Sequence, residues 1–324
     1  MIAQIVEQAY SQAVYPVLLR LVGGATSLLP FALADALPIA AIVLCAAGIA
    51  GLRRRWRVDR RRALVWAAKA ISLAGAGVYL AFLLLWGLNY RRQPLAQSLG
   101  LQPGPAPVEE LAGLASELVA AANDQRADRN ERDGVFRLAR GVDPALAQLA
   151  GTVRPKPSLL SPVLARLGIS GIFVPFTLEP LVNDRLPESE IPWSAAHEMA
   201  HAAGWAREDE ANFLAWRRCR DHADPDFRYS GSLVASLYAV GAIADVAPDQ
   251  GRAVAEARSP AVRRDIEAIR LYQARYEGRL ARAGERVNDA YLRSQGDSRG
   301  VHSYGRMVDL LLAERRARRP LVRS

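Results

Sequence analysis

Two long uncharged apolar runs dominate the N-terminal third of the chain. The first covers residues 36–52 (ALPIAAIVLCAAGIAGL) and the second covers residues 70–88 (AISLAGAGVYLAFLLLWGL). At about 1.5 Å per helical residue, each run is roughly 25 to 29 Å long, close to the thickness of a bilayer hydrocarbon core. Two helices buried in a soluble core are the alternative, but that would need a large domain to cover them. We therefore expect two transmembrane helices, at about residues 34–52 and 70–88.

Seven arginines separate the two apolar runs, within the ten residues Arg53–Arg62 (RRRWRVDRRR). A short basic loop between two spans is typical of the cytoplasmic side of a membrane. This predicts a multi-pass protein of the cytoplasmic membrane whose residues beyond Leu88 lie outside the cytoplasm. Arg91 and Arg92 oppose this orientation, but seven arginines outweigh two.

Residues 10–34 are also apolar, but Pro16, Arg20, Gly23, Gly24 and Pro30 interrupt them. This pattern favours a helix that lies on the outer surface of the bilayer over a third span. The N-terminal stretch has no basic start and no clean cleavage site, which disfavours a signal peptide. Residues 1–90 are therefore predicted to form the membrane region.

A linker rich in proline and glycine covers residues 91–107, and residues 108–324 are predicted to form one extracytoplasmic domain. Apolar positions recur at helical spacing from about Val108, over residues 253–286, and near Arg306 to Glu314. Residues 169–183 (ISGIFVPFTLEPLVN) are aromatic and β-branched but broken by prolines, which predicts an edge strand. One strand among many helices indicates an α+β fold in which helices dominate.

The charge of the chain supports a membrane more than a nucleic acid as its partner. The formal net charge is +9, and it comes almost entirely from arginine, because Lys69 and Lys156 are the only lysines. The arginines cluster beside apolar runs, and no basic motif is interleaved with aromatic residues. Cys45 and Cys219 are the only cysteines, which excludes a disulfide framework and a cysteine metal cluster. We expect the lipid bilayer as a partner and no nucleic acid.

The stretch IPWSAAHEMAHAAGWAREDEANFLAW (residues 191–216) contains the candidate chemistry. His197 and His201 are four residues apart, so both imidazoles project from one face of a helix, and Glu198 lies beside that face. Residues 194–203 carry no other charge, which predicts a buried helix. Burying ionisable groups costs several kcal/mol unless they are paired or bound to a metal. A satisfied structural histidine is the alternative, but two histidines and a glutamate in this register favour zinc.

A second helix is expected to supply the third ligand. Gly204 can end the first helix with a left-handed cap, so that the chain turns back over it. In the following REDEANFLAW, Glu208, Ala211 and Asn212 share one face, with Ala215 one turn further on. We predict that Glu208 is the third ligand and that Asn212 hydrogen-bonds a ligand histidine. Glu210 on another face is the alternative ligand, and Asp209 is expected to face solvent.

Three protein ligands and one open position are typical of catalytic rather than structural zinc. Zinc lowers the pKa of a bound water toward ~7, and Glu198 is predicted to take the proton of this water as general base. The oxyanion then needs a further donor, for which Tyr229, His302 and Tyr304 all remain candidates. His222, beside aspartates in CRDHADPD, is expected to be a surface loop residue.

Over almost its whole length, the chain resembles the bacterial domain-of-unknown-function family 3810, membrane proteins with a zincin-type motif. The resemblance rests on WGLNYRR, KPSLLSPVLARLGISGIFVPFT, HEMAHAAGWAREDEANFLA, FRYSG and YLRSQGDSRGVHSYGRMVDLLLA. PFTLEPLVN departs from the more usual Gly-Glu-Ala version of this stretch, so the resemblance assigns no role to Glu179. The resemblance implies a zinc metallopeptidase-like domain with one zinc per chain, but no particular substrate.

The Glu-x-x-x-Asn arrangement is also similar to that of gluzincin peptidases. That similarity implies that an edge strand, here Ile172, Phe173, Val174 and Pro175, pairs with an extended substrate. The leading prediction is a membrane-anchored zinc metallopeptidase that cuts peptides or proteins of the cell envelope on the periplasmic side. The alternative is a non-catalytic zinc-binding envelope protein that retains the zincin fold. An intramembrane protease is disfavoured, because the charged Arg207–Glu210 follows the motif closely.

Overall fold

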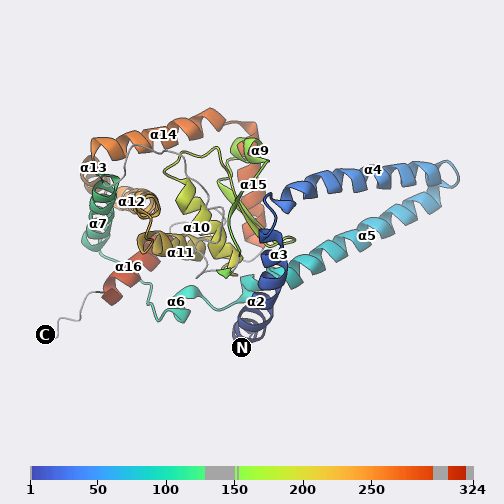
Figure 1. The fold of residues 1–324 in the computed structure, drawn as a ribbon, viewed down its shortest axis with the longest axis horizontal. Coiled ribbons are helices and arrows are strands. Elements are labelled where there is room, and N and C mark those ends of the chain that lie inside the picture. Colours follow the sequence, from blue (N-terminus) through green and yellow to red (C-terminus); the bar gives the residue numbers. More distant parts are fainter. Residues whose placement is uncertain (1, 128–149, 152, 295–305, 319–324) are drawn as a thin grey trace.

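The computed structural model describes residues 2–127, 150–151, 153–294 and 306–318, and Figure 1 shows their arrangement. Helices dominate the described part of the chain, and a single three-stranded sheet accompanies them. The predicted predominance of helices is therefore confirmed.

Two long apolar helices leave the body of the protein together as a hairpin (Figure 1). They are α4 (Leu37–Trp56) and α5 (Arg60–Leu85). Their large side chains are exposed, including Ile42 and Leu73, and almost none of the surface of either helix is buried in the protein. Both helices are long and apolar enough to cross a membrane.

The arginine stretch between them is mostly helical, not the ten-residue loop expected. α4 continues to Trp56, and Asp59 caps α5 by accepting the N–H of Arg62, so only residues 57–59 lie outside both helices. A third helix, α12 (Pro225–Val246), is also apolar enough to span a membrane, but 61 % of its most apolar stretch is buried inside the protein. Within the described residues, α12 is therefore a core helix.

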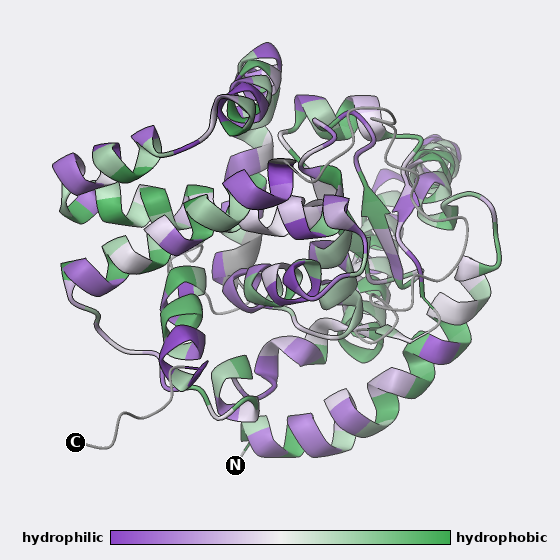
Figure 2. Cartoon of the chain, turned by 60° about the vertical axis from the view of Figure 1, so that its left-hand side comes forward, coloured by the Kyte–Doolittle hydropathy of each residue, from purple (hydrophilic) through white to green (hydrophobic). Residues whose placement is uncertain are grey.

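The N-terminal segment is a continuous curved helix whose hydrophobic and hydrophilic residues alternate (Figure 2). Its parts are α1 (Ile2–Ile5), a π-helical stretch η1 (Val6–Val14), α2 (Tyr15–Leu18), a second π-helical stretch η2 (Leu19–Gly23) and α3 (Gly24–Ser27). Tyr10, Tyr15 and Leu19 are buried against the body, whereas Val17 and Leu21 are exposed. The short η3 (Leu33–Ala36) then leads into α4. The helix is thus packed along one side on the protein itself.

A short helix, η4 (Gly87–Arg91), precedes the linker, the linker contains α6 (Leu95–Ser98), and α7 (Val108–Ala127) begins at the predicted residue. The single helix expected over residues 253–286 is wrong. Three helices cover this region, α13 (Pro248–Glu256), α14 (Pro260–Tyr276) and α15 (Arg279–Ser294). The breaks have local causes: Ser259 caps α14 ahead of Pro260, and Gly278 separates α14 from α15. The final helix, α16 (Arg306–Arg318), confirms the predicted one and extends it.

The sheet has the strand order β1-β3-β2. β1 is Lys156–Pro157, β2 is Gly171–Val174 and β3 is Glu179–Val182, and α9 (Ser161–Arg166) lies between β1 and β2. β3 pairs in parallel with β1 and antiparallel with β2. The segment expected to be one edge strand is therefore two strands, joined by a turn in which Leu178 has a φ of 52°. Of the two, β2 is the edge strand.

The core of the body forms where α10 (Ile191–Ala202) packs against α11 (Glu208–Arg220), α12 and the strands β2 and β3. Phe173, Met199 and Phe213 are buried together in this core. On its far side, α12 packs against α7. The helix that carries the His-Glu-x-x-His motif is thus the centre of the body.

Candidate metal centre

Every residue of α10 except His197 is buried, and His197 is half-buried. The helix is built from small and apolar residues, so its neighbours approach closely, and Ala195, Ala196 and Ala200 have no exposed surface. The predicted buried helix is confirmed. Its histidines and glutamate therefore need partners inside the protein.

Gly204 ends α10 in the left-handed conformation, with a φ of +83°, as predicted. The N–H of Gly204 donates to the carbonyl of His201 at 2.8 Å, and the N–H of Trp205 donates to the carbonyl of Ala200 at 3.1 Å. This pair of bonds is the Schellman motif. It reverses the chain, so that α11 begins four residues later with Glu208 facing α10.

Three side chains from these two helices converge on one point. The Nε2 atoms of His197 and His201 are 3.0 Å apart. Oε2 of Glu208 lies 3.3 Å from Nε2 of His197, and Oε1 lies 3.5 Å from Nε2 of His201. Four-coordinate zinc with bonds of about 2.0–2.1 Å places neighbouring ligand atoms about 3.3 Å apart. The three side chains therefore fit a tetrahedral zinc ion.

The protonation of His201 also fits a metal ligand. Its Nδ1 lies 2.8 Å from the carbonyl oxygen of Trp205. A carbonyl only accepts, so Nδ1 carries a hydrogen, and Nε2 is the ring atom that faces Glu208 and His197 and is left to bind a metal once it is deprotonated. The turn after Gly204 thus supplies both the reversal of the chain and the group that orients the imidazole.

The predicted hydrogen bond from Asn212 to a ligand histidine is absent from the described part of the chain. Nδ2 of Asn212 is buried without a partner, and so is Nδ1 of His197. The carbonyl of Trp205 takes the role that was assigned to Asn212 for His201. The prediction considered only side chains, whereas the group that acts here is a main-chain carbonyl in the turn.

The charges in the cluster depend on one another. Burial by itself lowers the pKa of His201, but the neighbouring Glu208 carboxylate outweighs this and raises that pKa to about 9. Burial raises the pKa of Glu208, but His201 and His197 hold it well below its usual value. Without a metal, a proton on the imidazoles balances the carboxylate. A divalent cation would replace that proton, so metal affinity should fall as the pH falls.

Glu198 lies beside the three converging side chains without belonging to them. Glu198 is only 3 % exposed, and its carboxylate accepts the main-chain N–H of Phe173 in β2. Burial raises the pKa of Glu198 and outweighs the opposing effects of His197 and His201. A Cβ on Gly171 would lie only 2.6 Å from Oε1 of Glu198, so only glycine leaves room for the carboxylate. The edge strand therefore fixes the position of Glu198.

Of the three candidate oxyanion donors, only Tyr229 lies among the described residues, and it is not at the cluster. Tyr229 is fully buried, and its hydroxyl donates to Asp265 of α14 at 2.6 Å. Its ring packs with Val262 and Ile266 in a hydrophobic cluster separate from the core around α10. His302 and Tyr304 lie outside the described residues. The structure thus places Tyr229 away from His197, His201 and Glu208.

Tyr238 is a residue on the α10 side of α12 that the sequence reasoning missed. Its ring lies 6.4 Å from that of Trp193 on α10, and after burial the charges of Glu208 and Glu190 raise the pKa of its hydroxyl further. Tyr238 and Tyr229 are nine residues apart on α12, which at about 100° per residue puts them on opposite faces. If the sequence analysis had predicted a helix here, its periodicity would have placed Tyr238, and not Tyr229, on the face toward α10.

Three further predictions about polar residues are tested by their surroundings. His222 is buried and stacks on Phe227 with ring centroids 4.0 Å apart, so it is not a surface residue. Asp209 is buried and pairs with Arg306 of α16 at 3.2 Å, so it does not face solvent. The partner of Asp209 lies on a distant helix and is invisible in a local pattern, whereas the ring partner of His222 is only five residues away. Glu210 accepts the N–H of Leu95 at 2.8 Å and turns away from the histidines.

The last turn of α10 is held by residues that flank the apolar hairpin. The indole of Trp86 donates to the main-chain carbonyl of His201. The hydroxyl of Tyr15 donates to the carbonyl of Ala202 at 2.6 Å, and Arg92 donates to the carbonyl of Gly204 at 3.0 Å. Tyr15 thus provides a partner for the carbonyl of Ala202 at the helix end, and Trp86 provides a second donor to that of His201, which already accepts the N–H of Gly204. The candidate metal centre consequently lies next to the base of the hairpin.

The chain belongs to the family described as a protein of unknown function (DUF3810), whose model matches residues 10–312. This confirms the family resemblance seen in the sequence. No curated protein and no solved structure matches the chain.

Proposed function

We propose that this protein is a membrane-anchored, zinc-dependent hydrolase of peptide bonds. The observation that carries the proposal is the convergence of His197, His201 and Glu208, with Glu198 held beside them by β2. Two imidazoles and one carboxylate form the ligand set of a catalytic zinc site, which keeps one position for water or substrate. Zinc in such a site polarises a carbonyl and lowers the pKa of a water ligand toward ~7.

Glu198 is the proposed general base. It takes a proton from the attacking water at its carboxylate and can return it to the leaving amine. The N–H of Phe173 and the close contact with Gly171 restrict the carboxylate to one orientation. Glu198 is not one of the three converging side chains, so a non-catalytic zinc site would not need a carboxylate at this position, which favours catalysis over a non-catalytic zinc protein.

The outer edge of β2 is the proposed site for the substrate backbone. The main-chain N–H of Asn183 donates to the carbonyl of Ser170, which makes residues 170 and 183 a hydrogen-bonded pair. In an antiparallel pair of strands such pairs alternate along the strand, so the next one joins Ile172 to Leu181. The main-chain groups of Gly171 and Phe173 therefore point away from β3. Because the N–H of Phe173 goes to Glu198, an added peptide strand would pair with Gly171 and with the carbonyl of Phe173.

The membrane anchor is proposed to be the α4–α5 hairpin, with the body on the periplasmic side of a bacterial cytoplasmic membrane. The arginines at the tip of the hairpin, between Arg53 and Arg62, support this orientation. Exposed apolar residues of the N-terminal helix, such as Val17 and Leu21, are proposed to lie in the bilayer surface. With the metal centre at the base of the hairpin, substrates would be peptides or proteins of the envelope close to the membrane.

A topology experiment tests this placement. An alkaline phosphatase fused after Arg92 should be active outside the cytoplasm, and one fused after Val58 in the hairpin tip should be inactive. The reverse pattern would put the body in the cytoplasm and rule out envelope substrates.

The activity is tested on the full chain purified in detergent. We expect about one zinc per chain, cleavage of members of a peptide library by the wild type, and loss of cleavage in Glu198→Gln with the zinc retained. Glu188→Gln is the matched control, since Glu188 is exposed and does not belong to the cluster. Equal cleavage by Glu198→Gln and wild type would exclude the proposed base. Bound zinc without cleavage of any peptide would favour a non-catalytic envelope protein.

A further inference from the structure

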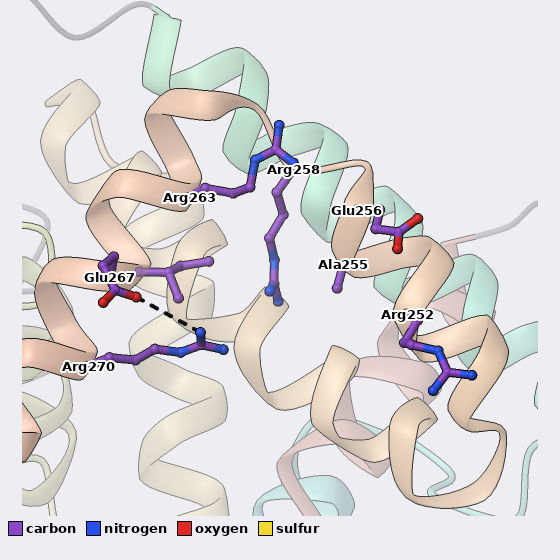
Figure 3. Close-up of a pocket in the computed structure, with 8 residues that line it drawn as sticks. Arg252, Ala255, Glu256, Arg258, Arg263, Glu267 and Arg270 are labelled. Carbon is purple, nitrogen blue, oxygen red and sulfur yellow. Dashed lines mark ion pairs between the residues drawn. The ribbon is translucent and has the colours of Figure 1, made fainter.

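A second site lies away from the metal centre, in a pocket of about 380 Å³ between α13 and α14 (Figure 3). The volume falls within the range of ~300–1,000 Å³ that is typical of ligand sites. The charged residues that line it are Arg252, Arg258, Arg263, Arg270, Glu256 and Glu267. Four arginines against two glutamates give the pocket an excess of positive charge.

Arg258 is the unusual member of this group. It lies in the junction between α13 and α14 and is only 9 % exposed. Its Nε is buried without a hydrogen-bond partner, and no described carboxylate forms an ion pair with it. Figure 3 shows its side chain entering the space between the two helices. Burial, and then the positive charge of Arg270, lower the pKa of Arg258.

An unpaired buried charge is strongly unfavourable, because water is removed and nothing replaces it. The glutamates of the pocket do not provide that replacement. Glu267 approaches Arg270, at 4.0 Å, and no ion pair joins Glu256 to Arg258 among the described residues. The pocket therefore contains a guanidinium group to which a bound anion would supply the missing counter-charge and hydrogen-bond acceptors.

We propose that this pocket binds a phosphate group. A guanidinium presents parallel N–H donors that match two phosphate oxygens, and its charge makes these bonds stronger than neutral ones. Arg258 provides the buried donor, and Arg263 and Arg270 of α14 provide further positive charge at the rim. The phosphate could belong to a soluble compound or to a lipid headgroup. Figure 1 favours a soluble compound, because α13 lies on the opposite side of the body from the α4–α5 hairpin.

The test uses the full chain in nanodiscs of neutral phosphatidylcholine, titrated by calorimetry with inorganic phosphate and separately with the water-soluble lipid dihexanoyl phosphatidic acid. One site per chain is expected. Tighter binding of phosphate would identify a soluble ligand, and tighter binding of the lipid would identify a headgroup. Saturable binding of neither probe would overturn the proposal.

Variants separate this pocket from general attraction to a basic protein. Arg258→Gln and Arg270→Gln should each weaken binding at least tenfold, whereas Arg264→Gln, an exposed arginine of α14 outside the pocket, should change it less than twofold. An equal loss in all three would show non-specific attraction and overturn the proposal. Arg270 is exposed, so its variant tests the site even if Arg258→Gln fails to fold.

A last measurement distinguishes a ligand-binding arginine from a structural one. Arg258→Met keeps the length of the side chain but removes the unpaired charge. Without phosphate, this variant should unfold at a higher temperature than the wild type, and phosphate should raise the unfolding temperature of the wild type alone. Destabilisation by Arg258→Met, with no effect of phosphate on the wild type, would assign Arg258 to packing and reject the site.

Discussion

The indole Nε1 of Trp86 donates a hydrogen bond of 3.0 Å to the main-chain carbonyl of His201. Trp86 directly follows the last residue of α5, and His201 lies in the last turn of α10. The two rings also meet edge to face, with centroids 6.1 Å apart and an interplanar angle of 81°. One side chain thus connects the apolar hairpin to a proposed zinc ligand.

Trp86→Phe should therefore affect the metal centre as well as the fold. The ring contact is retained in part, but the buried carbonyl of His201 loses one of its two donors and keeps only the N–H of Gly204, which costs about 0.5–1.5 kcal/mol. We expect a lower unfolding temperature and weaker zinc binding, measured by thermal unfolding with and without added zinc. Trp66→Phe, within α5 but in contact with Arg55 of the hairpin, is the control and should change neither. Equal effects of the two substitutions would contradict a specific link through Trp86.

The two glutamates of α11 give a second prediction. Glu208 faces both histidines, whereas Glu210 accepts the N–H of Leu95 and pairs with Arg207 at 3.2 Å. Glu208→Gln should sharply lower zinc affinity, because a neutral amide is a much poorer ligand than a carboxylate. Glu210→Gln should bind zinc within a few-fold of the wild type. Competition with a chromogenic chelator measures both. Release of zinc by Glu210→Gln alone would show that the assigned ligand is wrong.

The sequence predicted the parts of the candidate site that depend on local geometry. The spacing of His197 and His201 follows from the helical repeat, and Gly204 signals the turn that brings Glu208 back. These features involve residues within a dozen positions of one another, so helical periodicity and one glycine suffice. The hairpin was predictable for a similar reason, because uninterrupted apolar runs need no knowledge of distant partners.

The remainder depends on contacts between distant segments. Asp209 is buried by Arg306, and the hydroxyl of Tyr229 is taken by Asp265 of another helix. No local pattern identifies such pairs. The region 253–286 was mispredicted for a different reason, since its apolar periodicity continues through Pro260 and Gly278, where caps and breakers end the helices. In this region, the residues that cap or break a helix determine where the helices end, and the apolar periodicity does not.

The buried ion pair between Lys156 and Glu179 is one of these distant contacts and gives a third prediction. Nζ of Lys156 lies 2.7 Å from Glu179 and also donates to the carbonyls of Thr26 and Phe31. Glu179 in turn accepts the N–H of Ala34 at 2.7 Å. The pair therefore joins the sheet to the segment that leads into α4, which is the role that the family resemblance left open for Glu179.

Glu179→Gln leaves the buried ammonium without its counter-charge, and breaking such a pair costs about 3–5 kcal/mol. Combining Lys156→Met with Glu179→Gln removes both charges, while the amide oxygen can still accept the N–H of Ala34, so this double variant should be more stable than Glu179→Gln alone. Denaturant unfolding of the two variants and the wild type measures the difference. Asp184→Asn is the control, because it changes an exposed acid two residues after β3 and should have little effect. A double variant less stable than Glu179→Gln would contradict the electrostatic account.

Glu190 supports a prediction about pH. It precedes α10 and lines a cavity of about 230 Å³ with Tyr272 and Tyr276. Burial raises the pKa of Glu190 from 4.5 to about 7. Because folding raises this pKa, the folded state holds the proton more tightly than the unfolded state. The contribution to stability is therefore full below pH 4.5 and is lost as the pH rises toward 7.

Glu190→Gln removes this dependence, since glutamine has no proton to lose. The variant should unfold at nearly the same temperature as the wild type at pH 4.5 but roughly 2–5 °C higher at pH 8. Thermal unfolding across this range, without added metal so that the histidine cluster titrates equally in both proteins, measures the difference. Glu188→Gln is the control, because Glu188 is exposed and its substitution should give no trend with pH. A constant offset between Glu190→Gln and wild type at every pH would mean that the side chain acts by packing, because only a change in protonation makes the difference grow through this range.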